Sequence, residues 1–492
     1  MTRSISSVLV ANRGEIAVRI LRSVRKAGLT GVIVHHAVDA DTPAVRMADK
    51  AVQISGSTPV AAYLDGPQIV AAALASGADA IHPGYGFLSE NAEFARACDA
   101  AGIVFIGPRA ETIDLMGDKV RARNFVESRG FPVAPSAIED DDPATFVERA
   151  RAVGAPLLIK PSAGGGGKGM RIVRDLALLE EEIERGRNEG QRYFGDGRLF
   201  AERYVERPRH IEVQVLGDAH GNVVHLFERE CSLQRRFQKV VEEAPSPTLP
   251  ADERARICEV AAGIARAAGY VGAGTVEFIY GRGEFFFLEM NTRIQVEHPV
   301  TEEVTGVDLV SEQLRVAAGE PLGYGQDDLA IKGHAIEVRV YAEDSARGFV
   351  PTTGPLLVMI PPSGDGIRID SGVEQGGAVT AAFDPMIAKL IVHASSRAEA
   401  LDKADAALAA FVILGCRTNI GYLRRLLRDP DVRAGAIHTG LIGEKPELAA
   451  DPVPDKASLR RVLAAAALST RAVVDSADAV PVLHAAIGGW RN

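Results

Sequence analysis

The first hundred residues alternate short apolar runs with amphipathic stretches. The apolar runs predict buried strands and the stretches with helical spacing predict helices, in the order 7–11 (strand), 14–27 (helix), 31–35 (strand), 68–76 (helix) and 80–82 (strand). Strands that are separated by helices pair in parallel, because each helix carries the chain back across the sheet. We therefore expect a doubly wound α/β domain over residues 1–114.

The pattern then changes to an α+β mixture, which we expect to form a second domain over residues 115–332. A mixed α/β region at 333–446 follows, and a Pro/Asp-rich linker with a short helix near 459–468 makes up the tail, 447–492. In the strand at 335–341, apolar residues alternate with polar ones. Taken alone, this alternation turns Arg339 away from the core as a solvated cation.

The most polar strand pattern lies in the stretch that follows residue 284. A strand at 275–280 and a second strand from residue 285 are joined by a short Gly-Arg-Gly-Glu segment, which predicts a hairpin. With a three-residue loop, Ile279 pairs with Phe287 and Glu277 lies opposite Glu289, about 5 Å away. If the second strand continues to residue 299, five polar side chains share one face: Glu289, Asn291, Arg293, Gln295 and Glu297.

Two ionised carboxylates at this spacing repel each other, so that one takes a proton or a cation lies between them. Asn291, two residues along, adds an oxygen ligand of the kind that Mg²⁺ or Mn²⁺ prefers. We therefore predict a metal site at Glu277, Glu289 and Asn291. The alternative is an amphipathic hairpin with a solvated polar face.

The charge, the cysteine spacing and the length of the apolar runs exclude some classes of function. The chain has 492 residues, a net charge of −10 and 24% charged residues, so an extended basic surface for nucleic acid is not expected. Its four cysteines are far apart and form no CxxC pair, which fits a reducing compartment. The chain runs directly into its first strand without a signal or transit segment, and no apolar run has the ~20 residues of a membrane span, so we expect a cytoplasmic protein without membrane contact.

Three segments, two of them glycine-rich, do not match the common nucleotide-binding motifs. The first turn of the Rossmann-like N-terminal domain, at 11–15, lacks the GxGxxG fingerprint, and Ser89 replaces the third glycine of the later GxG segment at 84–89. The run at 162–169 is not a Walker A loop, because Ser162 stands at the first glycine position and Gly169 follows Lys168. It joins two strands, so we expect a mobile lid that folds over a nucleotide; a simple surface loop is the alternative.

Several motifs in fixed order resemble biotin carboxylase. They are residues 10–17, 82–91, 116–119, 164–169, 234–239 and 289–298, and the resemblance extends from about residue 7 to 444. It implies an ATP-grasp ligase that forms a carbon–nitrogen bond: ATP phosphorylates bicarbonate, and the carboxyphosphate that results carboxylates N1 of biotin on a carrier protein. The resemblance also implies that the central domain is an ATP-grasp domain whose lid covers about 133–204.

The resemblance assigns roles to individual residues. Glu277, Glu289 and Asn291 fall on the metal positions, and the catalytic positions are Glu297 as the base for bicarbonate, Arg293 and Lys239 beside the bicarbonate, and Arg339 at the biotin enolate. Cofactor-binding positions are Lys119, Lys160, Gly164, Gly165, Gly166, Gly167, Lys168, Gly169, Met170, Glu202, Arg203, Val205, His210, Gln234, Gln295 and Val296. Two positions depart from relatives: Arg203 replaces a common Lys, and Phe237 replaces a His found in some members.

The implied partners follow from what the chain lacks. It contains no Met-Lys-Met biotinylation motif, so we expect biotin on a separate carrier domain or protein, and a carboxyltransferase β subunit that uses the product. We also expect a homo-oligomer, and a chain that is either a shortened or a naturally reduced acyl-CoA carboxylase α subunit. The competing hypotheses are a biotin-independent ATP-grasp ligase and a nucleotide-binding regulatory subunit without chemistry.

Overall fold

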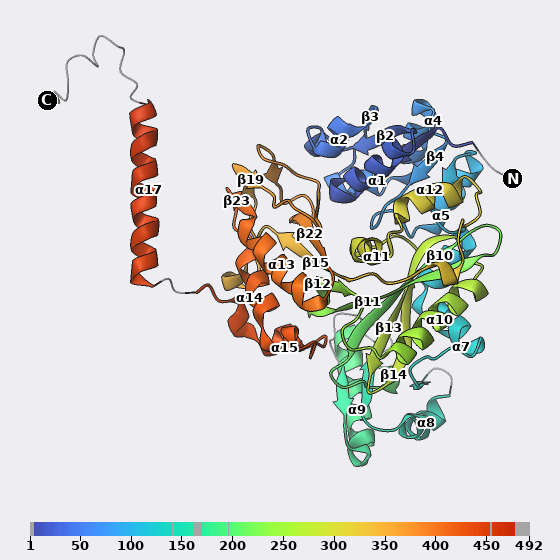
Figure 1. The fold of residues 1–492 in the computed structure, drawn as a ribbon. Coiled ribbons are helices and arrows are strands. Elements are labelled where there is room, and N and C mark those ends of the chain that lie inside the picture. Colours follow the sequence, from blue (N-terminus) through green and yellow to red (C-terminus); the bar gives the residue numbers. More distant parts are fainter. Residues whose placement is uncertain (1–3, 140–141, 162–169, 195, 453–454, 478–492) are drawn as a thin grey trace, which may run out of the picture. The chain divides into compact units, whose positions relative to one another are not determined.

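A computed structural model describes residues 4–139, 142–161, 170–194, 196–452 and 455–477. The chain divides into two compact units, Met1–Leu448 and Ala449–Asn492. The first unit contains a parallel sheet, a large antiparallel sheet and a smaller antiparallel sheet, each covered by helices (Figure 1). The prediction of a multidomain α/β and α+β protein is confirmed.

The N-terminal sheet is fully parallel, as predicted, with strand order β3-β2-β1-β4-β5. Its strands are β1 (Ser7–Val10), β2 (Thr30–His35), β3 (Lys50–Gln53), β4 (Ala80–His82) and β5 (Val104–Phe105). Its helices are α1 (Gly14–Lys26), α2 (Pro43–Met47), α3 (Pro59–Tyr63), α4 (Gly66–Ser76), α5 (Ala92–Ala100) and α6 (Ala110–Gly117). Successive residues of β1 enter different cores, Val8 and Val10 on one face and Leu9 on the other, because side chains alternate along a strand.

An eight-stranded antiparallel sheet runs through the middle of the unit, in the order β14-β13-β10-β11-β12-β15-β22-β20. Its strands are β10 (Arg209–Gly217), β11 (Val223–Arg235), β12 (Gln238–Ala244), β13 (Gly272–Gly281), β14 (Glu284–Asn291), β15 (His334–Tyr341), β20 (Ile367–Ser371) and β22 (Met386–Ala394). Helices α7 (Lys119–Ser128), α10 (Ala251–Ala267), α11 (His298–Thr305) and α12 (Leu309–Ala317) accompany it. Because β12 pairs with β15, the sheet joins the two regions that the sequence pattern separates at residue 333.

The β13–β14 hairpin has the predicted pairing of Glu277 with Glu289, but it reaches this register in another way. The turn has two residues, Arg282 and Gly283, both with positive φ (53° and 79°), so Ile279 pairs with Phe286 and the predicted Phe287 is wrong. A bulge at Leu288 then restores the register. The predicted extension to residue 299 is also wrong, since β14 ends at Asn291.

A four-stranded antiparallel sheet with its own core forms the region predicted as a lid. Its order is β6-β9-β7-β8, from β6 (Ser136–Ile138), β7 (Leu157–Pro161), β8 (Arg171–Val173) and β9 (Leu199–Arg203), with helices α8 (Phe146–Val153) and α9 (Leu179–Phe194). Strands β7 and β8 are antiparallel partners, which confirms the strand-to-strand setting of the glycine-rich run. The predicted contacts of Gly164, Gly165, Gly166, Gly167, Lys168 and Gly169 lie outside the described residues.

The C-terminal part of the first unit packs helices against the continuation of the large sheet. These are α13 (Arg397–Ala410), α14 (Ile420–Arg428), α15 (Pro430–Arg433) and α16 (Leu441–Glu444); the minor strands are β16 (Glu343–Asp344), β17 (Val350–Pro351), β18 (Gly354–Pro355), β19 (Val358–Ile360), β21 (Ala378–Val379) and β23 (Val412–Leu414). Both faces of β15 are buried. The interpretation of Arg339 as a solvated cation is therefore wrong: α11 and the preceding loop cover that face, and Arg339 is 8% exposed.

In the second unit, α17 (Lys456–Ala477) is longer than the helix predicted at 459–468. Asp455 caps its start through the backbone N–H groups of Ala457 and Ser458, and alanines at 464–467 favour its continuation. None of the described helices is both long enough and apolar enough to span a bilayer.

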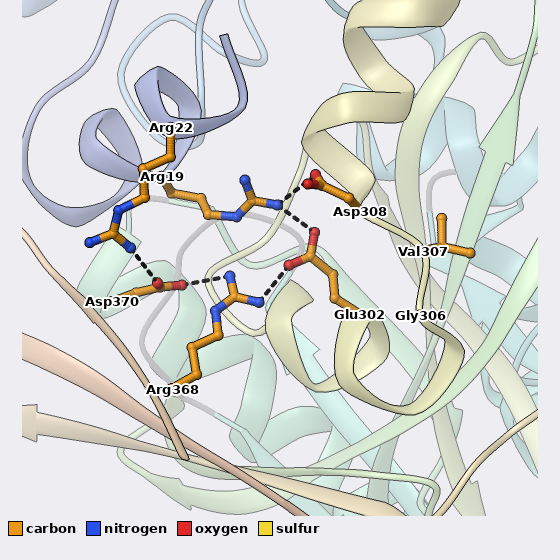
Figure 2. A pocket seen from close by; sticks show the side chains of 8 residues that line it. All are labelled: Arg19, Arg22, Glu302, Gly306, Val307, Asp308, Arg368 and Asp370. Carbon is orange, nitrogen blue, oxygen red and sulfur yellow. Dashed lines mark hydrogen bonds and ion pairs between the residues drawn. The ribbon is translucent and has the colours of Figure 1, made fainter. Parts of the chain in front are cut away.

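An ion-pair network fixes α11 relative to the N-terminal domain (Figure 2). Arg19 of α1 reaches Glu302 of α11 at 2.7 Å and Asp308 at 2.8 Å, and Arg368 of β20 binds the other oxygen of Glu302 at 2.8 Å. Asp370 joins Arg368 at 2.8 Å. Since Glu297 is the N-cap residue of α11, this network helps to place the end of the helix that faces the candidate site.

Candidate active site

Lys239 of β12 lies among three buried carboxylates. Its Nζ is 2.5 Å from Glu212 Oε2, 2.5 Å from Glu297 Oε1 and 3.2 Å from Glu277 Oε1. Burial opposes the charge on Lys239, but the three carboxylates outweigh it and hold the pKa of the ammonium group well above its usual value. His210 also belongs here, with Nε2 2.9 Å from Glu277 Oε2.

Glu297 lies between two cations. Besides Lys239, it accepts a hydrogen bond from Arg339 NH2 at 3.0 Å, while Arg339 Nε donates to Glu242 at 2.6 Å. Burial would raise the pKa of Glu297, but the Lys239 ammonium and two guanidinium groups lower it well below its usual value. Glu297 is therefore an ionised carboxylate that can accept a proton.

The sequence pattern did not point to Arg229, a buried arginine that binds Glu212 and several polar side chains around the Lys239 cluster. This side chain is 0% exposed and donates to Glu212 (2.6 Å), Gln214 (2.8 Å), Thr301 (2.8 Å), Gln295 (2.8 Å) and Thr275 (3.2 Å). The sequence offered a weak signal, because Arg229 stands between two glutamates directly after a stretch that contains Val223, Val224, Leu226 and Phe227. Glu212 was missed in the same way.

Arg293 and Gln295 connect the loop after β14 to the cluster. Arg293 donates to Asn291 Oδ1 at 2.9 Å and to Glu90 of the N-terminal domain at 2.9 Å, and Gln295 Nε2 donates to Glu277 at 2.7 Å. The side chains predicted to share one strand face thus do come together. They do so through an irregular loop rather than a continued strand.

The predicted metal ligands share one side of the hairpin. Glu277 pairs with Glu289, Thr275 pairs with Asn291, and paired residues of an antiparallel ladder point the same way. Asn291 Nδ2 donates to Glu277 at 3.0 Å. Each carboxylate also has an ammonium group beside it, Lys239 Nζ at 3.2 Å from Glu277 and Lys119 Nζ at 2.7 Å from Glu289. A set of two carboxylates and one amide oxygen fits Mg²⁺ or Mn²⁺.

The remaining predicted contacts lie on or next to the small sheet, or on the large sheet and its loops. On the small sheet, Lys160 and Glu202 form an ion pair at 2.8 Å. The Nε of Arg203, on the same sheet, is buried and has no hydrogen-bond partner among the described residues. Met170 is exposed and Val205 half-buried, whereas Gln234 is buried and donates to Cys231 O at 2.8 Å. The carbonyl oxygen of Val296 accepts from Lys389 at 2.6 Å.

A pocket of about 390 Å³ opens beside Arg339. Its lining includes Tyr85 and Glu15, whose side chains are hydrogen-bonded to each other. It also includes the rings of Phe87 and Phe383, with the guanidinium of Arg13 over the Phe383 ring. The cluster around Lys239 thus adjoins a cavity lined by both polar and aromatic side chains, large enough for a small bicyclic ligand.

The parallel N-terminal sheet, the large antiparallel sheet with its buried cluster of carboxylates and cations, and the C-terminal region can now be compared with known families. Residues 4–113 match the biotin carboxylase N-terminal domain, 118–324 the ATP-binding domain of the carbamoyl-phosphate synthase L chain, and 337–444 the biotin carboxylase C-terminal domain. The chain belongs to the biotin carboxylase family.

Individual relatives are similar over most of this chain. Biotin carboxylase of Allochromatium vinosum is 48% identical over 437 residues, which are 88% of this chain and 97% of the relative. The mitochondrial methylcrotonoyl-CoA carboxylase subunit alpha of Mus musculus is 48% identical over 442 residues, but these cover only 62% of that longer protein. The biotin carboxylase domain dimer of Hydrogenobacter thermophilus 2-oxoglutarate carboxylase, solved with MgADP, ADP and bicarbonate, is 44% identical with a TM-score of 0.82, covering 92% of this chain and 100% of that one.

Proposed function

We propose that this chain catalyses the ATP-dependent carboxylation of biotin on a carrier protein with bicarbonate, the first half-reaction of an acyl-CoA carboxylase. The observation that carries the proposal is the position of Glu297, an ionised carboxylate within 3.0 Å of both Lys239 and Arg339. Bicarbonate is a poor nucleophile until its proton moves to a base, and Glu297 supplies that base. The family and the relatives support the same reaction.

The cations beside Glu297 suit the anions of this reaction. As bicarbonate attacks the terminal phosphorus of ATP, charge accumulates on the carbonate and the transferring phosphoryl group. We assign Lys239 and Arg293 to hold these charges in place. Carboxyphosphate then breaks down to CO₂ and phosphate, and that phosphate removes the proton from N1 of biotin. The resulting enolate is assigned to the guanidinium of Arg339.

We assign the pocket beside Arg339 to biotin. Among its lining residues, Arg339 and Tyr85 suit the polar ureido ring, and the rings of Phe87 and Phe383 suit the aliphatic chain that leads to the carrier. The pocket also adjoins Val296, one residue before the base. Biotin N1 would thereby lie close to where CO₂ is released.

The nucleotide is assigned to residues of the small and the large sheet. Lys160, Glu202, Arg203 and Val205 come from or adjoin the small sheet, and His210 and Gln234 come from the large one. The glycine-rich run, with Lys168, remains the predicted lid over the phosphates, and Lys119, Met170, Gln295 and Val296 keep their predicted roles as well. We retain the domain boundaries 1–114, 115–332, 333–446 and 447–492.

The proposed metal ligands are Glu277, Glu289 and Asn291, and a bound Mg²⁺ or Mn²⁺ would neutralise charge on the ATP phosphates. Replacing Glu289 by glutamine should raise the Mg²⁺ concentration needed for half-maximal turnover, because one charged oxygen ligand is lost. A metal titration of ATP hydrolysis measures this shift. Glu284→Gln, an exposed glutamate of the same strand, is the matched control. Equal titrations for Glu289→Gln and the native protein would rule out Glu289 as a ligand.

The function is tested by measuring ADP release. ATP hydrolysis should require bicarbonate and should rise when free biotin is added. Indifference to both would overturn the proposal, and a requirement for an amine instead would favour a biotin-independent ATP-grasp ligase. Tight ATP binding without any turnover would favour a regulatory subunit.

The partners follow from this function. We propose a biotinylated carrier domain or protein and a carboxyltransferase β subunit, together with self-association of this chain into a homo-oligomer. The location in the cytoplasm stays a prediction. Purification of the protein with its biotinylated carrier would identify both partners, and the carboxyltransferase would show which acyl-CoA is finally carboxylated.

A further inference from the structure

Two buried carboxyl groups lie side by side behind the active-site cluster and take no part in the chemistry above. Glu242 of β12 and Glu337 of β15 are direct partners in the antiparallel ladder, and both residues are 0% exposed. Directly opposed residues have Cβ atoms about 5 Å apart and point to the same face. Their carboxyl groups are therefore neighbours in a region without solvent.

The pair has far fewer hydrogen-bond donors than acceptors. Glu242 Oε1 accepts from Arg339 Nε at 2.6 Å. Glu242 Oε2 and both oxygens of Glu337 are buried without a partner among the residues that the structure describes. A buried acceptor without a donor costs about 1–3 kcal/mol, and more when it is charged. A proton on one of the two carboxyl groups would supply the missing donor.

The charges around the pair cannot neutralise both carboxylates. From the elements packed against it, the charged or titratable groups are Lys239 and Arg339, Lys389 of β22, Glu297 in front of α11, His298 of α11, and Cys231 of β11, whose pKa burial raises well above its usual value so that the thiol is neutral. Lys239 and Arg339 already bind Glu297, and Lys389 Nζ is occupied by Val296 O at 2.6 Å and Glu15 at 3.3 Å. His298 stays neutral, because burial holds its pKa well below the usual value.

Electrostatics agree with this geometry. Burial, opposed by Arg339 and reinforced by Glu297, raises the pKa of Glu242 to about 7. Burial and the charge of Glu242 raise the pKa of Glu337 well above its usual value, although Lys389 opposes this. Two neighbouring buried carboxyl groups, only one of which is hydrogen-bonded to a cation, behave as a pair that keeps one proton.

We propose that Glu242 and Glu337 share one proton, carried by Glu337, and that this pair positions Arg339 for the biotin half of the reaction. Protonated Glu337 donates to Glu242 Oε2, which leaves Oε1 as an anion for Arg339 Nε. The other end of the guanidinium then remains 3.0 Å from Glu297. The inference rests on the proposed function, since Arg339 is the residue assigned to the enolate.

The test compares variants of Glu337 that can and cannot donate. Glu337→Leu leaves Glu242 Oε2 without a donor and should raise KM for free biotin, without a matching change in KM for ATP. Glu337→Gln has a neutral group of similar size with an N–H to donate, and it should restore KM for biotin. A Glu337→Gln protein as impaired as Glu337→Leu, with both folded, would overturn the proposal, because Glu337 would then act as an anion.

The pH dependence has a defined sign. A raised pKa means that the folded protein holds a proton that the unfolded chain releases, so this stabilisation is present at low pH and is lost as the pH rises through the folded-state pKa. Native protein should therefore lose affinity for biotin, and thermal stability, at alkaline pH more than Glu337→Gln does. Identical profiles would contradict the shared proton.

A spectroscopic measurement separates this inference from the function. The infrared spectrum of the native protein should contain the carbonyl stretch of a buried protonated carboxylic acid at neutral pH. The part of this band that comes from the pair should be lost in Glu337→Gln, so it should appear in the native-minus-Glu337→Gln difference spectrum and be absent from the native-minus-Glu284→Gln difference spectrum, the exposed control. A native protein without the band has no shared proton, whether or not it hydrolyses ATP. A protein with the band but without bicarbonate-dependent turnover would instead contradict the proposed function alone.

Discussion

Replacing Glu297 by glutamine should abolish bicarbonate-dependent ATP turnover while ATP binding persists. The amide is the same size but cannot accept the bicarbonate proton, and loss of a positioned general base typically costs about 100-fold to 10,000-fold in rate. The fold should tolerate the change, because Lys239 keeps Glu212 and Glu277 as partners and Arg339 keeps Glu242. Steady-state ADP release with and without bicarbonate measures the effect.

Binding of a nucleotide analogue to Glu297→Gln provides the necessary control. If nucleotide affinity fell together with turnover, Glu297 would be a structural partner of Lys239 rather than a base. Glu284→Gln changes an exposed glutamate on the same hairpin and should have native kinetics. If Glu297→Gln retained bicarbonate-dependent turnover, Glu297 would not be the base that accepts the bicarbonate proton.

Replacing Arg229 by methionine should be the most destabilising single change in the site. It leaves the buried Glu212 carboxylate with Lys239 as its remaining close cation and removes the donors to Gln214, Thr275, Gln295 and Thr301. Breaking a buried ion pair from one side costs about 3–5 kcal/mol of unfolding free energy. Thermal unfolding of the native and variant proteins measures this loss.

The control for Arg229 is a change at an exposed ion pair. Arg185 of α9 is 55% exposed and pairs with Glu181 and Glu182, so Arg185→Met should cost no more than about 1 kcal/mol. Arg229→Lys keeps the charge but lacks the planar fork that reaches several acceptors, so it should restore only part of the stability. Equal stability of Arg229→Met and Arg185→Met would show that the buried network contributes little.

The sequence by itself determined the class of fold and named most of the residues that the structure brings together around Lys239. Alternating strands and helices predicted the parallel N-terminal sheet, because local apolar periodicity depends on which face of each element is buried. The hairpin pattern correctly placed Glu277 opposite Glu289, although two errors cancelled: the turn is one residue shorter than assumed, and the bulge at Leu288 adds that residue back. Turn length and bulges depend on positive φ and sheet twist, which residue types indicate only weakly.

Only the tertiary structure decided which charges meet. Arg339 has the pattern of a solvated strand residue, yet α11 covers it, so that it bridges Glu242 and Glu297. Arg229 and Glu337 lie in strands that are almost entirely buried, and their local sequence indicates only weakly that they are not surface residues. Their roles arise because β11, β12 and β15 pair in one sheet, which brings together residues about a hundred positions apart. Periodicity reports the burial of a local face, whereas electrostatic partners are set by long-range packing.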